Sequence, residues 1–162
     1  RVAYLSDKLH AHGSGFDPSK QAIEFGIKEF PQLTLKTGFA DSPPFCEKFQ
    51  LVHLGFFLYL VDRELYLKSL AEADNLVAPG GFLSIIDFDP PYPYSNVYKY
   101  GQKGIFSYKN NNSATFVASG LYSIVNKYSF SHESFYFSEE IDDRVSLTLL
   151  YKEKKIYSTE ID

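Results

Sequence analysis

The sequence is poor in several residue types, and each shortage argues against a class of protein. Its 162 residues include no Met, no Trp and a single cysteine, Cys46. One cysteine cannot form an internal disulfide framework and fits a reducing compartment, so we expect a cytoplasmic protein. No run reaches the roughly 18 apolar residues of a membrane span, and no signal peptide is visible at the start. We therefore expect no membrane partner.

An excess of positive charge is also missing. The chain has 16 Lys and Arg against 20 Asp and Glu, which gives a net charge of -4 at pH 7. Because binding to nucleic acid depends on basic surfaces, we expect no nucleic-acid partner. The histidines lack metal-ligand spacing and Cys46 has no His or Cys near it, so we expect no metal site. No feature of the sequence indicates an oligomeric state.

A strand–helix–strand unit is the most regular part of the chain. Phe49–Phe56 is an apolar strand, and Val61–Val77 carries apolar residues three to four positions apart, which predicts an amphipathic helix. Pro79 ends this helix, and the two glycines after it supply the positive φ of a tight turn. Phe82–Phe88 is then a nearly continuous apolar run, as expected for a strand buried on both faces of a parallel sheet.

Helices and strands alternate on both sides of this unit. Before it we expect a helix, a strand, a helix and a strand at Arg1–His12, Gly13–Asp17, Ala22–Phe30 and Leu33–Thr37. After it we expect, in order, a loop, a helix and two strands at Asp89–Asn96, Phe116–Lys127, Ser129–Phe137 and Arg144–Tyr151. The acidic turn Ser138–Asp143 joins the last two strands as a hairpin.

This alternation predicts a single α/β domain over residues 1–162, with a Rossmann-like open twisted sheet and helices on both faces. We expect the sheet to be mostly parallel, with an antiparallel last strand. Such folds start with a strand, so we also expect a strand before Arg1, which would make the domain incomplete at its N-terminus. Ligands of these sheets bind at the carboxyl ends of the strands, where Asp17, Asp41, His53 and Asp87 lie.

Four stretches resemble, in the right order, the class I S-adenosylmethionine-dependent methyltransferases. They are Gly15–Ser19, Gly38–Phe45, Phe49–Tyr59 and Pro79–Gly81. The resemblance covers nearly the whole chain and implies S-adenosylmethionine as the cofactor. The glycine-rich loop that the family places after its first strand does not occur in this sequence.

The resemblance implies that Asp17 binds the ribose hydroxyls of the cofactor, with Pro18 and Ser19 beside it. A carboxylate can accept both hydrogen bonds of a vicinal diol, and such a charge-assisted bond contributes about 1.5–3 kcal/mol net. The alternative is that Asp17 only caps the helix that follows Pro18.

Two further segments contribute cofactor contacts by the same resemblance. Ala40 and Asp41 lie in the segment whose acid contacts the adenine amino group. The alternative is that Asp41, in its Pro-rich loop, only forms a turn. The fourth strand and the loop beneath the methionine moiety correspond to His53, Leu54, Gly55 and Tyr59.

Asp87 is the candidate catalytic residue. Methyl transfer from a sulfonium requires a base only for acceptors that must lose a proton. Asp87 closes the strand that ends beside the expected position of the methyl group, so it could act as that base. The alternative is that its carboxylate caps the following loop.

The segment after this strand covers substrates in the family, and it supplies the candidate acceptor contacts. Asp89-Pro90-Pro91-Tyr92 matches a signature of amino-methyltransferases, but it follows the fifth strand instead of the fourth. We interpret it as a rigid rim of the substrate pocket. The candidate substrate residues are Asp89, Tyr92, Tyr98 and Tyr108.

We therefore expect S-adenosylmethionine-dependent methyl transfer to a small-molecule acceptor, at oxygen. An NAD-type nucleotide-binding oxidoreductase is an alternative, because an acid after the second strand binds ribose there too. The terminal hairpin favours the methyltransferase over an all-parallel dinucleotide-binding sheet. A third possibility is a catalytically inactive methyltransferase-like domain that only binds partners.

Overall fold

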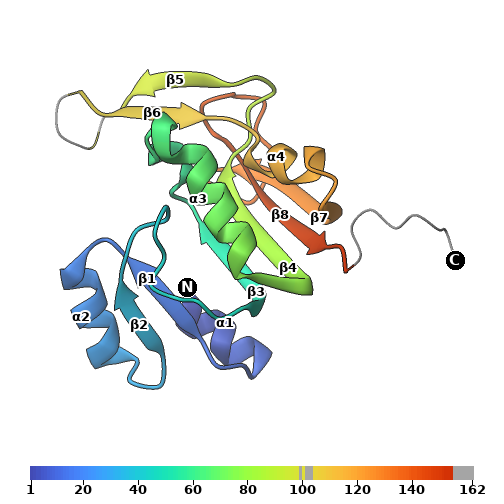
Figure 1. Cartoon of the computed structure of the whole chain (residues 1–162). Helices are drawn as coiled ribbons and strands as arrows, with labels where there is room; N and C mark the ends of the chain where they lie inside the picture. Colours follow the sequence, from blue (N-terminus) through green and yellow to red (C-terminus); the bar gives the residue numbers. More distant parts are fainter. Residues whose placement is uncertain (99, 101–103, 155–162) are drawn as a thin grey trace, which may run out of the picture.

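Figure 1 shows the computed structural model of the chain, which describes residues 1–98, 100 and 104–154. The elements are α1 (Val2–Leu9), β1 (Ser14–Asp17), α2 (Lys20–Glu29), β2 (Thr34–Thr37), β3 (Phe49–Gly55), α3 (Arg63–Leu76), β4 (Val77–Phe88), β5 (Tyr94–Val97), β6 (Phe106–Lys109), α4 (Asn112–Ala118), β7 (Tyr122–Ser131) and β8 (Arg144–Lys152). A short 3₁₀ turn, η1 (Leu58–Leu60), precedes α3. Within the described residues, no helix is long and apolar enough to cross a membrane.

The strands form one four-stranded sheet and two separate pairs. The larger sheet has the order β3–β4–β8–β7, in which β3 and β4 are parallel and β8 is antiparallel to both of its neighbours. β1 and β2 pair in parallel, and β5 and β6 form an antiparallel hairpin. In the part of the chain that the structure describes, β1 is not hydrogen-bonded to the larger sheet. An α/β fold with a mixed sheet is thus confirmed, whereas a mostly parallel sheet is not.

The core lies on one face of the larger sheet. It joins residues from its strands, η1, α3 and α4, namely Leu54, Leu58, Tyr66, Leu70, Ala73, Val77, Leu83, Ile85, Phe116, Tyr122 and Leu150. Because α3 and α4 both reach this cluster, they cover the same face, and Figure 1 shows α3 lying across β3 and β4. The prediction of helices on both faces is not confirmed for this sheet.

The side chains of β4 alternate between a buried and a more exposed face. Leu83, Ile85 and Asp87 are buried, whereas Phe82 and Phe88 lie on the other, partly exposed side. The prediction of a strand buried on both faces was therefore wrong. Successive side chains of a strand point to opposite faces, and only one face of β4 contacts the core.

The Pro-Gly-Gly segment lies inside β4 and not between a helix and a strand. α3 ends at Leu76 and β4 begins at the next residue. The register with β3 slips across this segment, so the segment forms a bulge. Gly80 has the predicted positive φ, 76°. Gly81 does not, but a Cβ there would lie 2.9 Å from the carbonyl oxygen of Ala78, so the bulge leaves no room for a side chain.

The last third of the chain differs most from the prediction. The helix predicted at Phe116–Lys127 was wrong beyond α4, because the chain reverses at Gly120, whose φ is 74°, and continues as β7. Ile124 and Val125 are 53% and 54% exposed, so their spacing marked no helical core face. The terminal hairpin is confirmed, but its first strand is β7, and of the predicted Ser129–Phe137 only the first three residues belong to it.

The β5–β6 hairpin was not predicted. The loop expected at Asp89–Asn96 includes most of β5, which pairs with β6 from Tyr94 opposite Lys109 to Val97 opposite Phe106. β5, Tyr-Ser-Asn-Val, shows no alternation of apolar and polar residues, and β6, Phe-Ser-Tyr-Lys, alternates over four residues only, so the signal from which strands are predicted is weak.

A buried ion pair joins the end of α3 to the larger sheet. Lys152 Nζ lies 2.7 Å from Asp74 Oδ1 and also donates to the carbonyl oxygen of Asp74 at 2.8 Å. The Tyr122 hydroxyl donates to the same carboxylate oxygen at 2.7 Å. Since Lys152 is only 8% exposed, its ammonium depends on this carboxylate for compensation of its charge.

We predict that Asp74→Ala lowers the free energy of unfolding by about 3–5 kcal/mol, because it leaves a buried ammonium without its partner. Urea unfolding followed by circular dichroism measures the change. The control is Glu24→Ala, which breaks the Lys20–Glu24 pair of α2, whose side chains are 82% and 65% exposed. The control variant should lower the free energy of unfolding by less than about 1 kcal/mol. Equal small losses in both variants would contradict a structural role of the buried pair.

Candidate functional site

The buried carboxyl group of Asp87 lies at the carboxyl end of β4, next to η1. Asp87 is 3% exposed and follows Leu83 and Ile85 on the core face of the strand. Its Oδ1 accepts a hydrogen bond from the backbone N–H of Phe88 at 2.8 Å. Its Oδ2 is buried and has no hydrogen-bond partner among the described residues. A buried carboxylate oxygen without a partner is unusual in a folded protein and suggests a functional position.

Burial raises the pKa of Asp87 from 3.8 to about 6. The backbone N–H groups of Phe88, Tyr59 and Leu58 act in the opposite direction, as does the charge of Arg63, but desolvation is the larger effect. A carboxyl group with a pKa near 6 is largely ionised at neutral pH and can still bind a proton readily. That is the property expected of a general base.

Aromatic side chains lie at the same end of β4. Tyr59 follows β3 in η1, and its ring contacts Phe88 at 5.1 Å and Tyr98 at 6.2 Å between ring centroids. Burial and, next, the hydrogen bond with Tyr98 raise the pKa of the Tyr59 hydroxyl to about 12. Tyr59 therefore stays neutral at physiological pH, and it shields one side of Asp87 from water without adding charge.

Phe56 is held in a strained backbone conformation directly after β3. Its φ is 62°, in the left-handed region that residues other than glycine rarely adopt. Its N–H donates to the carbonyl oxygen of Ile86, and its ring contacts Tyr59, Phe88 and His132 at about 5 Å. Strain of this kind costs about 1–3 kcal/mol and tends to occur at functional sites.

Arg63, the first residue of α3, lies beside the same carboxyl group. Its Nε and Nη2 donate to the carbonyl oxygens of Leu58 and Val61, which holds η1 against the helix. Its guanidinium carbon lies 4.2 Å from the ring centre of Tyr66 and 4.6 Å from that of Tyr108. Both distances are within the range of cation–π interactions.

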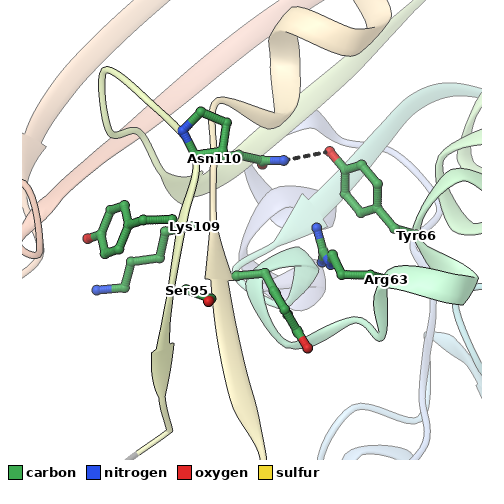
Figure 2. A pocket seen from close by; sticks show the side chains of 8 residues that line it. Arg63, Tyr66, Ser95, Lys109 and Asn110 are labelled. Atoms are coloured by element: carbon green, nitrogen blue, oxygen red, sulfur yellow. Dashed lines mark hydrogen bonds between the residues drawn. The ribbon is translucent and has the colours of Figure 1, made fainter.

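A cavity of about 370 Å³ opens between the start of α3 and the β5–β6 hairpin. Its lining includes Arg63, Tyr66, Tyr94, Tyr108, Lys109 and Asn110. Figure 2 shows that Arg63 and Tyr66 lie on one side of it, opposite Ser95 and Asn110. The charge of Arg63 acts on Asp87, so the cavity lies close to the carboxyl end of β4.

Asp17 lies at the carboxyl end of β1, opposite Thr37 of β2. Its Oδ1 accepts a hydrogen bond from the backbone N–H of Ser19 at 2.8 Å. Ser19, and not Asp17, caps α2, because its hydroxyl accepts a bond from the N–H of Ala22. Asp17 is exposed, and its Oδ2 has no hydrogen bond within the described residues. The segment through Pro18 thus presents an accessible carboxylate at the end of a strand.

Asp41 lies in the loop between β2 and β3, next to Ala40. Its Oδ2 is 3.3 Å from the Lys68 ammonium of α3. The Asp41 side chain is 23% exposed and that of Lys68 55% exposed, so this pair connects the loop to α3 near the surface. A ligand amino group at Asp41 would share the carboxylate with Lys68.

The three β3 residues differ in what they present. His53 Nδ1 lies 3.1 Å from the Ser84 hydroxyl, and burial, followed by the charge of Arg1, lowers the pKa of His53. The side chain of Leu54 is buried in the core. Gly55 ends the strand, and its carbonyl oxygen accepts a hydrogen bond from the Arg1 guanidinium. Gly55 thus contributes only its backbone to the end of β3, directly before Phe56 and η1.

Two predicted substrate residues lie apart from Asp87. The Asp89 carboxylate is held by Lys127 of β7 at 2.7 Å and lies 3.4 Å from the Ser129 hydroxyl. Tyr92 is 57% exposed and lines a second hollow with residues 139–142. Among the predicted residues, Tyr59 contacts Tyr98, and Tyr108 contacts Arg63, whose charge acts on Asp87.

Sequence reasoning missed Arg63, Phe56 and Asn110. Arg63 follows a helix-capping Asp62 in an amphipathic helix, where an arginine is normally an exposed surface residue. Phe56 gives no sequence signal for a positive φ, because phenylalanine rarely adopts one. Asn110 belongs to an asparagine-rich segment that reads as a turn. No local pattern indicated that these residues are functional.

No protein-family model matches the sequence, and no curated protein matches it. Solved structures do match. An S-adenosylmethionine-dependent methyltransferase from Methanosarcina mazei aligns with a TM-score of 0.73 and 12% identity, over 94% of this chain and 87% of that chain. The N-methyltransferase NodS from Bradyrhizobium japonicum, in complex with S-adenosylhomocysteine, has a TM-score of 0.63 and 13% identity, over 93% and 72%.

A third similar structure is the 1,6-didemethyltoxoflavin-N1-methyltransferase of Burkholderia thailandensis, with bound 1,6-didemethyltoxoflavin and S-adenosylhomocysteine. Its TM-score is 0.70 at 9% identity, over 93% of this chain and 65% of that chain. The chain therefore has the class I methyltransferase fold that the sequence predicted.

We predict that Asp87→Asn changes how the stability of the protein depends on pH. The folded-state pKa, about 6, lies above the ordinary 3.8, so the folded protein binds this proton more tightly than the unfolded chain does. The resulting stabilisation is fully present below about pH 4 and is lost as pH rises through about 6, by up to about 3 kcal/mol. Asn cannot ionise, so the variant should lack this loss.

Urea unfolding of both proteins at several pH values between 4 and 8 measures the difference in their free energies of unfolding. Asp7→Asn on the exposed face of α1 is the matched control and should leave the slope unchanged. A constant difference between wild type and Asp87→Asn over this pH range would show that Asp87 does not titrate as described.

Proposed function

We propose that the chain transfers the methyl group of S-adenosylmethionine to an oxygen atom of a small-molecule acceptor. The observation that carries this proposal is the Asp87 carboxyl group, which is buried at the end of β4 with one oxygen unpaired and a pKa near 6. It lies beside a cavity of small-molecule size, in a fold shared with S-adenosylmethionine-dependent methyltransferases.

The residues along the strand ends fit the cofactor. The accessible Oδ2 of Asp17 can accept hydrogen bonds from a ribose diol, and Asp41 can accept one from an adenine amino group. Gly55 and the strained Phe56 bring backbone close to the ligand edge without a bulky strand-end side chain. When bound, S-adenosylmethionine supplies a methyl group that is already activated by its sulfonium.

Asp87 would hold the proton that a hydroxyl acceptor must lose. Its unpaired Oδ2 can accept the acceptor's O–H as a hydrogen bond and then take the proton, which makes the acceptor oxygen more nucleophilic. Tyr59 lies near this carboxyl group and adds no charge to its surroundings. Arg63 lowers the cost of the negative charge on Asp87 while its own side chain fixes η1 in place.

A nitrogen acceptor is the nearest alternative within this proposal, because two of the similar structures are described as N-methyltransferases. Neutral nitrogen nucleophiles need less help from a base, so the presence of Asp87 favours oxygen. An NAD-type oxidoreductase fits less well, because β8 is antiparallel to both of its neighbours. The proposal includes a cytoplasmic location, with which the exposed free thiol of Cys46 is compatible.

We predict that S-adenosylhomocysteine binds the protein with micromolar affinity and that Asp17→Asn weakens binding by about 10- to 100-fold, since it removes a charge-assisted hydrogen bond. Asn can still accept the bond from the Ser19 N–H, so the local turn is retained. Isothermal titration calorimetry measures both affinities.

Asp7→Asn, on α1, removes the same charge from an exposed helix and should not change the affinity. NAD serves as the control ligand. Tighter binding of NAD than of S-adenosylhomocysteine would support the oxidoreductase and contradict the methyltransferase.

We also predict that the methylation rate depends on the ionised form of Asp87. With phenolic acceptors, kcat/KM should rise as pH increases through about 6 and then level off. Asp87→Asn should lower the rate by about 10²–10⁴-fold and leave S-adenosylhomocysteine binding unchanged. Release of S-adenosylhomocysteine measures the rate. A variant that keeps the wild-type rate and pH profile would exclude Asp87 as the base.

A further inference from the structure

The cavity between α3 and the β5–β6 hairpin is lined by the positively charged side chain of Arg63, part of which has no hydrogen-bond partner within the described residues. Nε and Nη2 of Arg63 are occupied by carbonyl oxygens, but Nη1 has no hydrogen bond within the described residues. Asp62 and Asp87 act on the charge of Arg63 from a distance, and neither is among the ion pairs of the described residues. The guanidinium therefore lines the cavity with two free N–H donors.

The other positive group of the cavity is already neutralised. Lys109 is 8% exposed, and its ammonium lies 3.2 Å from the Asp142 carboxylate and 3.0 Å from the Asp142 carbonyl oxygen. It also lies 3.9 Å from the ring centre of Phe88. Figure 2 shows the Lys109 amino group directed away from Arg63 and Tyr66. Arg63 is thus the cation available to a ligand.

A hydrogen-bond acceptor without a partner lies across the cavity from Arg63. The Tyr66 hydroxyl donates to Asn112 Oδ1 at 2.8 Å and accepts from Asn110 Nδ2 at 3.3 Å. In this arrangement the Asn110 amide is oriented with its Nδ2 toward Tyr66. Asn110 Oδ1 is consequently left buried and unpaired, and a ligand donor would satisfy it.

The chemistry of the two unsatisfied groups defines a ligand. The free Nη1 of the guanidinium can donate a charge-assisted hydrogen bond to a carboxylate oxygen, and the unpaired amide oxygen matches an O–H or N–H group. The tyrosine rings of the lining offer flat apolar surfaces, which suit a planar ring between the two polar ends.

We propose that this cavity binds an aromatic carboxylic acid that carries a hydroxyl group, with the carboxylate on Arg63 and a hydrogen-bond donor on Asn110 Oδ1. This binding does not depend on the proposed function, because the ligand's hydroxyl is held by Asn110 and is not the group that Asp87 would deprotonate.

The test uses three ligands of nearly the same shape, titrated calorimetrically against the wild-type protein with and without S-adenosylhomocysteine. para-Hydroxybenzoate carries both groups, para-hydroxybenzamide lacks the charge and benzoate lacks the hydroxyl. We expect the amide to bind about tenfold or more weakly than para-hydroxybenzoate and benzoate to bind several-fold more weakly. Equal affinities for acid and amide would overturn the proposal, and so would full displacement of the acid by millimolar inorganic phosphate.

Variants extend the same comparison. Arg63→Lys keeps the charge but removes the free Nη1, so it should weaken the binding of para-hydroxybenzoate by about tenfold and leave the binding of para-hydroxybenzamide unchanged. Lys20→Met removes a positive charge from the exposed surface of α2 and should have no effect. An unchanged affinity for the acid in Arg63→Lys would overturn the proposal. Because Arg63 also holds η1, thermal unfolding checks that Arg63→Lys is folded. If this variant does not fold, the comparison of the three ligands on the wild-type protein decides the question.

The two proposals can fail separately. Binding of S-adenosylhomocysteine without selective binding of the acid would overturn the acid pocket and leave the methyltransferase assignment intact. Selective binding of the acid without any binding of S-adenosylhomocysteine would support the pocket and overturn the proposed function.

Discussion

The burial of one carboxyl group, that of Asp87, is the constraint on which the rest of the site depends. A carboxylate that loses water must receive N–H groups or positive charge in exchange. The N–H of Phe88 bonds to it directly, and those of Leu58 and Tyr59, with the charge of Arg63, act in the same direction. η1 and the first turn of α3 must therefore lie against the end of β4. The same arrangement positions the wall of the cavity.

Aromatic side chains connect this carboxyl group to the cavity. Phe56, Tyr59 and Phe88 contact one another around the end of β4. Tyr66 and Tyr108 cover the guanidinium of Arg63. Such rings exclude water and supply no opposite charge. The carboxyl group of Asp87 therefore has a raised pKa, and the guanidinium of Arg63 keeps N–H donors that no acceptor occupies. The high content of Tyr and Phe in the sequence is thus partly explained by this site.

Local sequence patterns predicted the first half of the chain well and the last third poorly. β1, α2, β3 and α3 follow directly from apolar spacing and proline positions. The helix predicted through Ile124 failed, because those apolar residues owe their position to pairing of β7 with β8 and not to a helical face. Asp87 was identified from its place at a strand end, and Tyr59 from the resemblance to the methyltransferase family. Arg63 and Asn110 were not, because what distinguishes them is an unpaired donor and an unpaired acceptor, and pairing is a property of the folded chain.

The sequence by itself determined the α/β class, the strand–helix–strand unit at its centre and the presence of acids at the carboxyl ends of its strands. These features depend on interactions between near neighbours along the chain, such as helical spacing, caps and turns. Only the tertiary structure decided which of the acids is buried, that Asp89 pairs with Lys127 away from Asp87, and that the β5–β6 hairpin closes a cavity against α3. Burial and charge pairing join residues that are far apart in sequence, so no local pattern can specify them.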